Sequence, residues 1–418
     1  MDRRELLLAV YLPTVLLAFT QGVIVLSLPL LANETSDAYS FASIIVSAAA
    51  FGTLIADVPT GTVMLRLGLR RTMLIGSLLV ALSTWALAIP LDAPAVLALR
   101  LAAGIGTALW GLSRYTYITQ KIPPELRGRT IAGFGGINRI GVFAGPMIAG
   151  SLVTAYGLYS AFLLAGTLAA FAFAAAWRWI PGDAVAPRPP DAAHHAPDTG
   201  EIRGTWNAIA GNRSDVLFGA LAQVLAQVVR QGRHFLIPLY GVEVLSLEAV
   251  EVGLVMTASA VIDMVMFGPA GFLMDRFGRK FATIPSFSVM AVGIAMIPFA
   301  GGFTGLLAAG IVIGFGNGLG SGTMMTLGAD FAPSAYTSTF LSLWRFIGDS
   351  GQMIGPILVG VVAQLFTLRQ SAWVLSGCSV TCALMLFFLV RETRREHGSL
   401  EATEEGTEPE PVLQKQGG

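Results

Sequence analysis

Charge is scarce in this sequence. Asp, Glu, Lys and Arg make up only 12% of its 418 residues, whereas hydrophobic residues make up 54%, and the mean hydropathy is +0.68. A typical soluble domain contains about 25% charged residues. The composition therefore excludes an ordinary soluble globular protein, and we expect lipid to surround most of the chain.

Positive charge is not in excess either. The 26 Lys and Arg residues balance 26 Asp and Glu residues, so the formal net charge is zero. Because a nucleic-acid-binding surface needs a basic stripe to meet phosphates, no nucleic-acid partner is expected. Cysteine is nearly absent: Cys378 and Cys382 lie one helical turn apart in an apolar run. They form neither a disulfide framework nor, without other soft ligands, a metal site.

Motifs of familiar enzyme classes are also missing. The sequence contains no P-loop, no zinc-protease motif and no nucleophile elbow. The glycine-rich segment 310–322 follows no strand, so it is not a dinucleotide fingerprint; its spacing is typical of a membrane helix that packs closely. The sequence therefore predicts a protein that is not an enzyme and that holds no metal or other cofactor.

Long apolar runs, in contrast, fill the chain. A helix needs about 20 apolar residues to cross a hydrocarbon core of about 30 Å, and twelve runs come close to that length. They are Leu6–Leu31, Ser40–Leu65, Thr72–Ile89, Pro94–Ile118, Thr130–Thr154, Leu158–Trp179, Val216–Tyr240, Ala249–Met274, Ala282–Ala300, Gly305–Leu327, Thr339–Phe366 and Ser371–Val390. The sequence thus predicts an all-α membrane protein with twelve transmembrane helices.

Basic residues in alternate loops predict the orientation of these spans. Lys and Arg are retained on the cytoplasmic side, and one set of span ends is basic while the opposite loops are mainly acidic. The basic ends carry Arg3, Arg4, Arg66, Arg70, Arg71, Lys121, Arg127, Arg129, Arg276, Arg279, Lys280, Arg391, Arg394 and Arg395. We therefore expect both termini in the cytoplasm and the protein in the plasma (inner) membrane.

Two segments lie outside the predicted spans. Residues 181–212 are rich in Pro, Asp, His and Gly, as in a flexible linker. Residues 392–418 are polar and rich in Glu, as in a disordered tail. The predicted domains are an N-terminal six-helix bundle (1–180), the cytoplasmic linker (181–212), a C-terminal six-helix bundle (213–391) and the tail (392–418).

An internal repeat relates the two bundles at a constant offset of 210 residues. It aligns Gly61 with Gly271 and Gly68 with Gly278. It also aligns Gly141, Gly145, Pro146 and Gly150 with Gly351, Gly355, Pro356 and Gly360. Because each repeat holds six spans, both begin on the same side of the membrane. The repeat predicts pseudo-symmetric halves with a substrate site between them near mid-depth.

These repeated glycines and prolines predict close helix packing. Glycines about four residues apart let two helix backbones approach each other, while a proline removes a helical hydrogen bond and permits a bend. The motif could therefore seal or flex an interface between the halves, although packing within one half explains it equally well.

Charged residues inside the predicted spans are candidates for proton coupling. At about 1.5 Å per residue, Asp263 lies roughly 21 Å along its helix from the predicted outer end at Ala249, and Asp349 lies roughly 15 Å from the predicted inner end at Thr339. Arg345 precedes Asp349 by one turn, so the two can pair, whereas Asp263 has no charged neighbour on its own helix face. Arg139 is the repeat equivalent of Asp349.

Two interpretations of these charges stay open. A desolvated carboxylate favours its protonated form and a nearby cation reverses that preference, so such an acid can exchange a proton as its surroundings change. The alternative is a static ion pair that holds helices together. Asp57 lies nearer a cytoplasmic loop and could equally anchor that loop.

The segment GFLMDRFGRK resembles the signature loop of the major facilitator superfamily. The resemblance extends over all twelve spans and both half-repeats and implies two pseudo-symmetric six-helix bundles. It assigns a gating loop to Gly271, Asp275, Arg276, Gly278, Arg279 and Lys280. The equivalent loop of the first half departs from the family pattern, because Leu65 and Leu69 stand where an acidic and a basic residue are expected.

Two further motifs are similar to those of the superfamily. Arg100, followed by Gly104 and Gly106, looks like the fourth-helix motif implicated in proton transfer, although its side chain could instead reach the nearby outer surface. The fifth span resembles the antiporter motif found in exporters, with Ala132 and Ala149 in place of two glycines. Overall the chain looks most like the twelve-span drug/proton antiporter type.

The resemblance also implies that spans one, four, seven and ten line a central cavity. The candidate substrate-contacting residues are Gln21, Trp110, Arg114, Tyr115, Gln223, Gln227, Arg230 and Asn317. So sparse a polar set among many apolar residues fits an amphipathic organic compound better than a sugar. Arg230, Arg233 and His234 leave room for an anionic substrate.

The leading hypothesis is a monomeric secondary transporter that exports small amphipathic compounds by alternating access and uses the proton gradient. One alternative is proton-coupled uptake of an organic anion. The other is a non-transporting membrane sensor, which would bind its ligand without flux. A small molecule and the lipid bilayer are the expected partners in each case.

Overall fold

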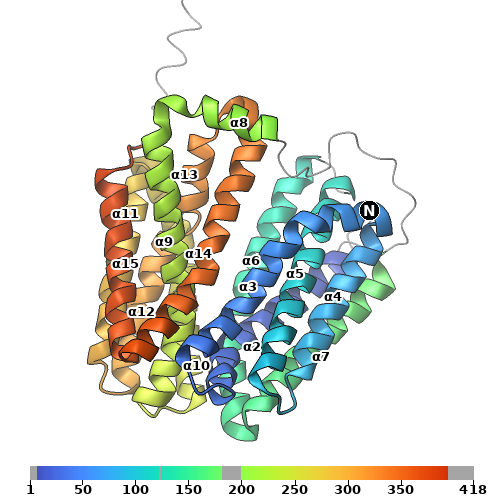
Figure 1. Ribbon diagram of the computed structural model, residues 1–418, viewed down its shortest axis with the longest axis vertical. Coiled ribbons are helices and arrows are strands. Elements are labelled where there is room, and N and C mark those ends of the chain that lie inside the picture. The colour runs from blue at the N-terminus through green and yellow to red at the C-terminus, as the bar shows by residue number, and fades with distance from the viewer. Residues whose placement is uncertain (1–6, 122–123, 181–198, 394–418) are drawn as a thin grey trace, which may run out of the picture.

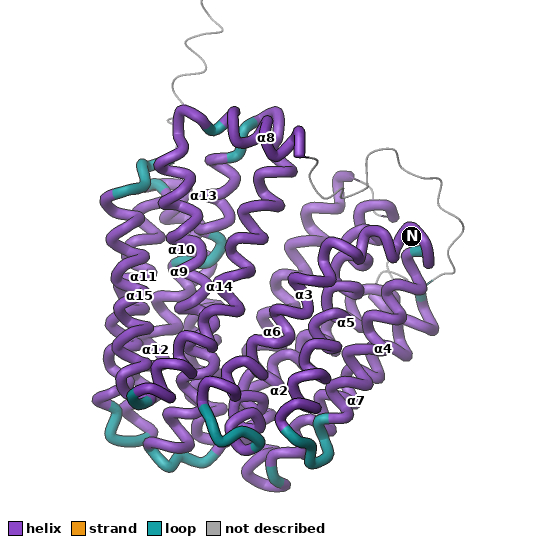
Figure 2. Tube along the Cα trace, in the orientation of Figure 1, coloured by secondary structure: helices purple, strands orange, loops and turns teal. Residues whose placement is uncertain are grey.

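The computed structural model describes residues 7–121, 124–180 and 199–393. In this part of the chain every regular element is a helix and no strand occurs (Figure 2). The predicted all-α fold class is therefore confirmed. Most of the predicted linker and all but the first two residues of the predicted tail lie outside the described residues.

Six long helices form the first half of the chain, and each agrees with one predicted span to within about six residues at either end. They are α2 (Leu12–Glu34), which continues a short π-helical turn at Leu7–Tyr11, α3 (Tyr39–Leu67), α4 (Leu69–Ala86), α5 (Ala93–Lys121), α6 (Pro124–Tyr156) and α7 (Leu158–Trp179).

The second half repeats this arrangement with one interruption. Its helices are α9 (Arg213–Leu239), α10 (Ala249–Phe277), α11 (Arg279–Met296), α12 (Phe303–Leu319), α13 (Thr323–Phe331), α14 (Thr337–Leu365) and α15 (Leu368–Phe388). Among the described residues, nine helical segments are long and apolar enough to cross a membrane by length and composition.

Two local features differ from the sequence prediction. Part of the expected flexible linker is helical, since Thr199–Ala208 forms α8. The predicted tenth span is not continuous: α12 ends at Leu319 and α13 begins at Thr323. Gly322 at this break has a φ of 78°, a backbone conformation that glycine adopts without steric strain. The glycines of this span therefore both allow close helix packing and interrupt the helix at the break.

The signature loop of the second half and its repeat equivalent make the same turn. Gly68 separates α3 from α4 with a φ of 85°, and Gly278 separates α10 from α11 with a φ of 109°. Only a residue without a Cβ adopts these angles readily. The tight turn is therefore sufficient to explain the repeated glycine, independently of any role of the charged residues beside it.

The two halves lie side by side and diverge toward the end that carries α8 (Figure 1). Two pairs of long helices join them: α6 packs against α10, and α3 packs against α14. Because α6 is the repeat equivalent of α14, and α3 of α10, the internal symmetry relates these two interfaces to each other.

The repeated glycines lie at the closest helix crossings. Gly141 and Gly145 lie against Ala18 and Gly22 of α2, so close that a Cβ at either position would overlap the α2 backbone. Gly150 lies equally close to Ala249 of α10 in the other half. The motif therefore packs α6 within its own half and also seals the interface between the halves.

The second half uses its copy of the motif in the same way. Gly351 and Gly355 lie against α9, at Val224 and Val228, whereas Gly360 lies against Ser43 of α3 in the first half. The correspondence between the two copies shows that the motif serves close packing at both symmetry-related positions.

Contacts between the halves are concentrated at the end opposite α8. On α3, Ser47 donates a hydrogen bond to the carbonyl of Met353 at 2.9 Å. Val58 lies about three turns further on the same helix face, yet it is 63% exposed. On α10, Thr257 donates to the carbonyl of Phe143 at 3.0 Å. The two halves are therefore closed against each other at one end and separated at the other.

Candidate functional site

An ion pair joins the two halves near the level at which they separate. Arg139 of α6 lies with its Nη1 3.8 Å from Oδ1 of Asp263 on α10. Arg139 also donates through Nη2 to Oγ of Ser321 at 2.6 Å, and its guanidinium carbon is 4.5 Å from the centre of the Phe267 ring. One residue of the first half thus contacts both α10 and the break between α12 and α13 in the second half.

Asp263 has a second partner within its own half. Asn317 of α12 donates through Nδ2 to Oδ2 of Asp263 at 2.9 Å. The two helices approach closely enough for this bond because Gly314 and Gly318 lie directly against the α10 backbone at Ser259 and Asp263. The glycine run of the tenth span therefore positions the amide of Asn317 on the carboxylate.

This network supplies what the sequence did not. Asp263 had no charged neighbour on its own helix, and its partner is more than a hundred residues away in the chain. Arg139, the repeat equivalent of Asp349, pairs with Asp263. Both residues were predicted as proton-coupling candidates, and the structure brings them together.

Arg230 reaches the break between α12 and α13. Its Nη2 donates to the carbonyl of Gly320 at 2.9 Å, and its guanidinium carbon is 5.6 Å from the centre of the Phe287 ring. The Nε–H of Arg230 is buried and has no hydrogen-bond partner among the described residues. A cation thus lies at a helix break with part of its donor capacity unused.

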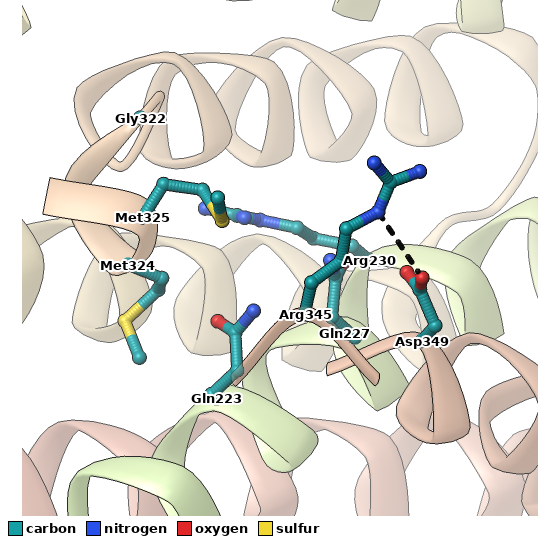
Figure 3. A pocket seen from close by; sticks show the side chains of 8 residues that line it. All are labelled: Gln223, Gln227, Arg230, Gly322, Met324, Met325, Arg345 and Asp349. Carbon is teal, nitrogen blue, oxygen red and sulfur yellow. Dashed lines mark ion pairs between the residues drawn. The ribbon is translucent and has the colours of Figure 1, made fainter. Parts of the chain in front are cut away.

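A pocket of about 250 Å³ opens beside this break (Figure 3). It is lined by Gln223, Gln227, Arg230, Gly322, Met324, Met325, Arg345 and Asp349. The first three come from α9, the next three from the break and the start of α13, and the last two from α14. Three of the predicted cavity residues therefore share one pocket in the second half.

The predicted pair on α14 forms one wall of this pocket. Arg345 Nε lies 3.5 Å from Oδ2 of Asp349, and Gln352 donates to Oδ1 of Asp349 at 2.5 Å. Across the interface, Asp57 of α3 lies within electrostatic range of both Arg345 and Asp349. The pairing one turn apart is confirmed, and Asp57 faces this pair from the other half.

The remaining predicted cavity residues do not join the pocket. Gln21 is exposed, and Tyr115 is half exposed. Trp110 is buried in the apolar core of the first half, and Arg114 donates through Nη1 to Oγ1 of Thr14 at 3.1 Å. Asn317 contacts Asp263 instead, as described above. The two halves thus contribute unequally to the polar site.

Arg100 is enclosed by the protein. Its side chain is buried, and its Nε–H has no hydrogen-bond partner among the described residues. The alternative that this guanidinium reaches out to the surface is therefore wrong for this conformation.

The charged loop between α10 and α11 is held mainly by residues that sequence reasoning missed. Arg279 lies with Nε 2.9 Å from Oδ2 of Asp330. Glu392 accepts the backbone N–H groups of Arg279 and Lys280, at 2.8 Å and 2.9 Å, so it caps the start of α11. Asp275, by contrast, is 85% exposed and 3.9 Å from Arg279.

The missed residues had only weak signals in the sequence. Asp330 and Glu392 lie at or near the ends of apolar runs, where a carboxylate is unremarkable. Ser321 lies among glycines that we interpreted as packing residues. Each of these three residues is identified by a partner that lies far away in the sequence, and a pattern of neighbouring residues cannot reveal such a partner.

Comparison with known proteins agrees with this architecture. The model of the Major Facilitator Superfamily matches residues 10–356 and, in a second match, residues 221–415. No curated protein matches the sequence significantly.

Among solved structures, a point mutant of the nucleoside transporter NupG is similar to this chain, with a TM-score of 0.74 and 14% sequence identity. The match covers 93% of this chain and 100% of the NupG chain. A D-xylose-proton symporter is also similar, with a TM-score of 0.71 and 19% sequence identity, and the match covers 94% of this chain and 99% of the symporter chain. Sequence identities this low establish only that the fold is shared. With its helices in two related bundles and a family match over most of its length, the chain belongs to the Major Facilitator Superfamily and is a membrane transporter rather than an enzyme.

Proposed function

We propose that this protein is a proton-coupled secondary transporter that exports small amphipathic organic compounds by alternating access. The observation that carries the proposal is the ion pair between Arg139 and Asp263, which crosses from one half to the other at 3.8 Å. A titratable group at such a position links its own protonation to the contact between the halves.

The coupling step follows from the chemistry of Asp263. While ionised, the carboxylate attracts Arg139 and favours the contact of α6 with α10, which belongs to the conformation open at the α8 end. A proton on the carboxylate removes that attraction, because a neutral acid no longer pairs with the guanidinium. Protonation of Asp263 therefore weakens this conformation relative to one in which the halves separate at the opposite end.

The basic loops support an orientation in which the α8 end faces the cytoplasm. In that orientation the described conformation is inward-facing, and the pocket beside Gly322 is accessible from the cytoplasm. A cytoplasmic compound could then enter directly, as export requires. The resemblance of the fifth span to the antiporter motif is the other support for export, although that motif also packs helices in both halves.

The lining of the pocket supports an amphipathic substrate. Met324 and Met325 offer flexible, polarisable apolar contacts, while Gln223, Gln227 and Arg230 offer hydrogen bonds. Ligand pockets commonly combine an apolar lining with a few placed polar groups. We propose that the protein acts as a monomer without a cofactor and that the proton gradient supplies the energy.

A second candidate function is proton-coupled uptake of an organic anion. Arg230 favours it, because this guanidinium borders the pocket and its buried Nε–H has no partner in the part of the chain that the structure describes. Export and uptake use the same site and the same coupling carboxylate, so they differ only in the direction of net flux relative to the proton gradient.

Flux measurements on the reconstituted protein test both functions. A chemically diverse set of compounds is offered to proteoliposomes under proton gradients of each polarity, with wild type compared with Asp263→Asn and Asp349→Asn. Export predicts compound flux opposite to proton flux, and uptake predicts flux in the same direction. Proton coupling is abandoned if a transported compound moves equally with and without the gradient and the two variants behave like wild type. Saturable binding without flux would identify a sensor.

A further inference from the structure

The pocket between α9 and the break in the tenth span has the features of an anion subsite. We propose that the transported compound is an amphipathic organic acid that also carries a hydrogen-bond donor, and that its acid group binds between Arg230 and the N-terminus of α13. This inference rests on the proposed transport function and specifies the chemical class of its substrate.

The N-terminus of α13 is the first element of the subsite. The first N–H groups of a helix have no acceptor within the helix, and the break provides acceptors for only some of them. Thr323 N–H bonds to the carbonyl of Gly320 and Thr326 N–H to that of Gly322, whereas those of Met324 and Met325 have no such bond among the described residues. Free N–H groups and the helix dipole both favour an anion here.

Arg230 is the second element. Its guanidinium borders the same pocket as Gly322 and Met325, and Figure 3 shows it extending toward Met325. One of its N–H groups donates to the Gly320 carbonyl, and the buried Nε–H is unpaired within the described parts of the chain. A carboxylate matches this combination, since a guanidinium binds carboxylates through two parallel hydrogen bonds.

Gln223 points to a further polar group on the ligand. This residue is only 3% exposed, borders the pocket, and has an Oε1 atom without a hydrogen-bond partner among the described residues. An unsatisfied buried acceptor is costly. Because Oε1 accepts and cannot donate, the acid itself does not satisfy it once ionised; a hydroxyl or amino group on the same molecule does.

The other charges around the pocket do not oppose an anion. Asp349 is engaged by Arg345 and Gln352, and Asp263, which is within electrostatic range of Arg230, is paired with Arg139. The three charged side chains that line the pocket, Arg230, Arg345 and Asp349, sum to one positive charge.

The size and lining of the pocket suggest where the rest of the ligand lies. A volume of about 250 Å³ is slightly below the range of about 300–1,000 Å³ for whole-ligand pockets, so it suits a head group with a small ring. Met324 and Met325 lie next to the proposed acid position, and methionine sulfur makes favourable contacts with aromatic rings.

Thermal stabilisation of the purified full-length protein by three matched probes tests the proposal. Mandelate carries an acid, a hydroxyl and a ring; mandelamide lacks the charge; phenylacetate lacks the hydroxyl. At neutral pH we expect mandelate to stabilise wild type at the lowest concentration, with phenylacetate weaker and mandelamide at least about tenfold weaker. Mandelamide as effective as mandelate would overturn the anion subsite, and phenylacetate as effective as mandelate would overturn the role of Gln223.

A matched pair of variants localises the effect. Met325 is half exposed at the start of α13, so both Met325→Glu and Met325→Gln are expected to fold. Only Met325→Glu places a negative charge in the subsite, and we expect it to weaken mandelate binding at least about tenfold relative to Met325→Gln. Arg230→Gln should have a similar effect, whereas Arg369→Gln, which removes one charge from an exposed position in the first turn of α15, should not. Equal binding by the two Met325 variants contradicts the proposal.

A lipid headgroup could supply the same anionic chemistry. The measurement is therefore repeated in nanodiscs of phosphatidylcholine with and without phosphatidylglycerol. If phosphatidylglycerol stabilises Met325→Gln but not Met325→Glu and mandelate has no effect, the anion is a lipid and the substrate proposal is wrong. If no acid binds while a neutral compound is transported by the proton gradient, the inference fails and the transport function stands.

Discussion

The substitution Asp263→Asn tests whether the ion pair between the halves controls which end of the protein is open. It removes the charge that attracts Arg139 while keeping a side chain of similar shape. The conformation closed at the end opposite α8 should then be less favoured, because one of the contacts that close it is weakened.

The structure gives a magnitude for this effect. Two unit charges 3.8 Å apart interact by about 4 kcal/mol at an effective dielectric constant of about 20. The side chains of Arg139 and Asp263 are 33% and 20% exposed, so screening and desolvation offset part of this, and we take about 1–2 kcal/mol. Such a change shifts a two-state equilibrium by a factor of about 5–30.

Cysteine labelling measures that shift. Ser47 is buried in the closed interface. A cysteine at this position, introduced as Ser47→Cys after both native cysteines are replaced by alanine, therefore reacts only when the halves separate at the end opposite α8. We expect Asp263→Asn to raise the rate of labelling by an impermeant maleimide about 5–30-fold. Asp92→Asn, which removes the same charge from an exposed position just before α5, is the control and should leave the rate within about twofold.

A double-mutant cycle decides whether the effect belongs to the pair. If Arg139 and Asp263 act together, Arg139→Gln should change the labelling rate less in the Asp263→Asn protein than in wild type, because the ion pair is already lost and only the contacts of Arg139 with Ser321 and Phe267 are left to remove. The reasoning is refuted if Asp263→Asn leaves labelling unchanged, or if the effects of the two substitutions simply add.

Two further predictions concern stability and are measured by thermal unfolding in detergent. Gly145→Ala should lower the free energy of unfolding by about 1–3 kcal/mol, because its Cβ would overlap the backbone of α2. Gly111→Ala should not, because outside its own stretch of helix no atom of the described chain lies within 4 Å of the new Cβ; equal melting temperatures would contradict the packing role of the motif. Asp330→Asn should lower the free energy of unfolding by about 1–3 kcal/mol, since it breaks a 2.9 Å charged hydrogen bond to Arg279, whereas Asp275→Asn, at an exposed position, should change it by less than about 1 kcal/mol. A larger loss of stability in Asp275→Asn than in Asp330→Asn would show that Asp275 is the main acidic partner in the loop.

Features that depend on neighbours along the chain were predictable. The pairing of Arg345 with Asp349 follows from one helical turn, and the tight turn at Gly278 was marked by its repeat equivalent Gly68. The same local reasoning failed for the tenth span, because a run of apolar residues and glycines is equally compatible with a continuous helix and with the break before Thr323.

The sequence by itself determined the twelve apolar runs, the duplication and the family resemblance, because hydropathy and a constant repeat offset are properties of the linear chain. Only the tertiary structure decided that Arg139 pairs with Asp263, that Asp330 rather than Asp275 is the closer acid to Arg279, and which end of the protein is open. Each of these depends on how a helix is rotated and how deeply it lies against another, and that is set by glycine crossings and side-chain packing between segments far apart in the chain.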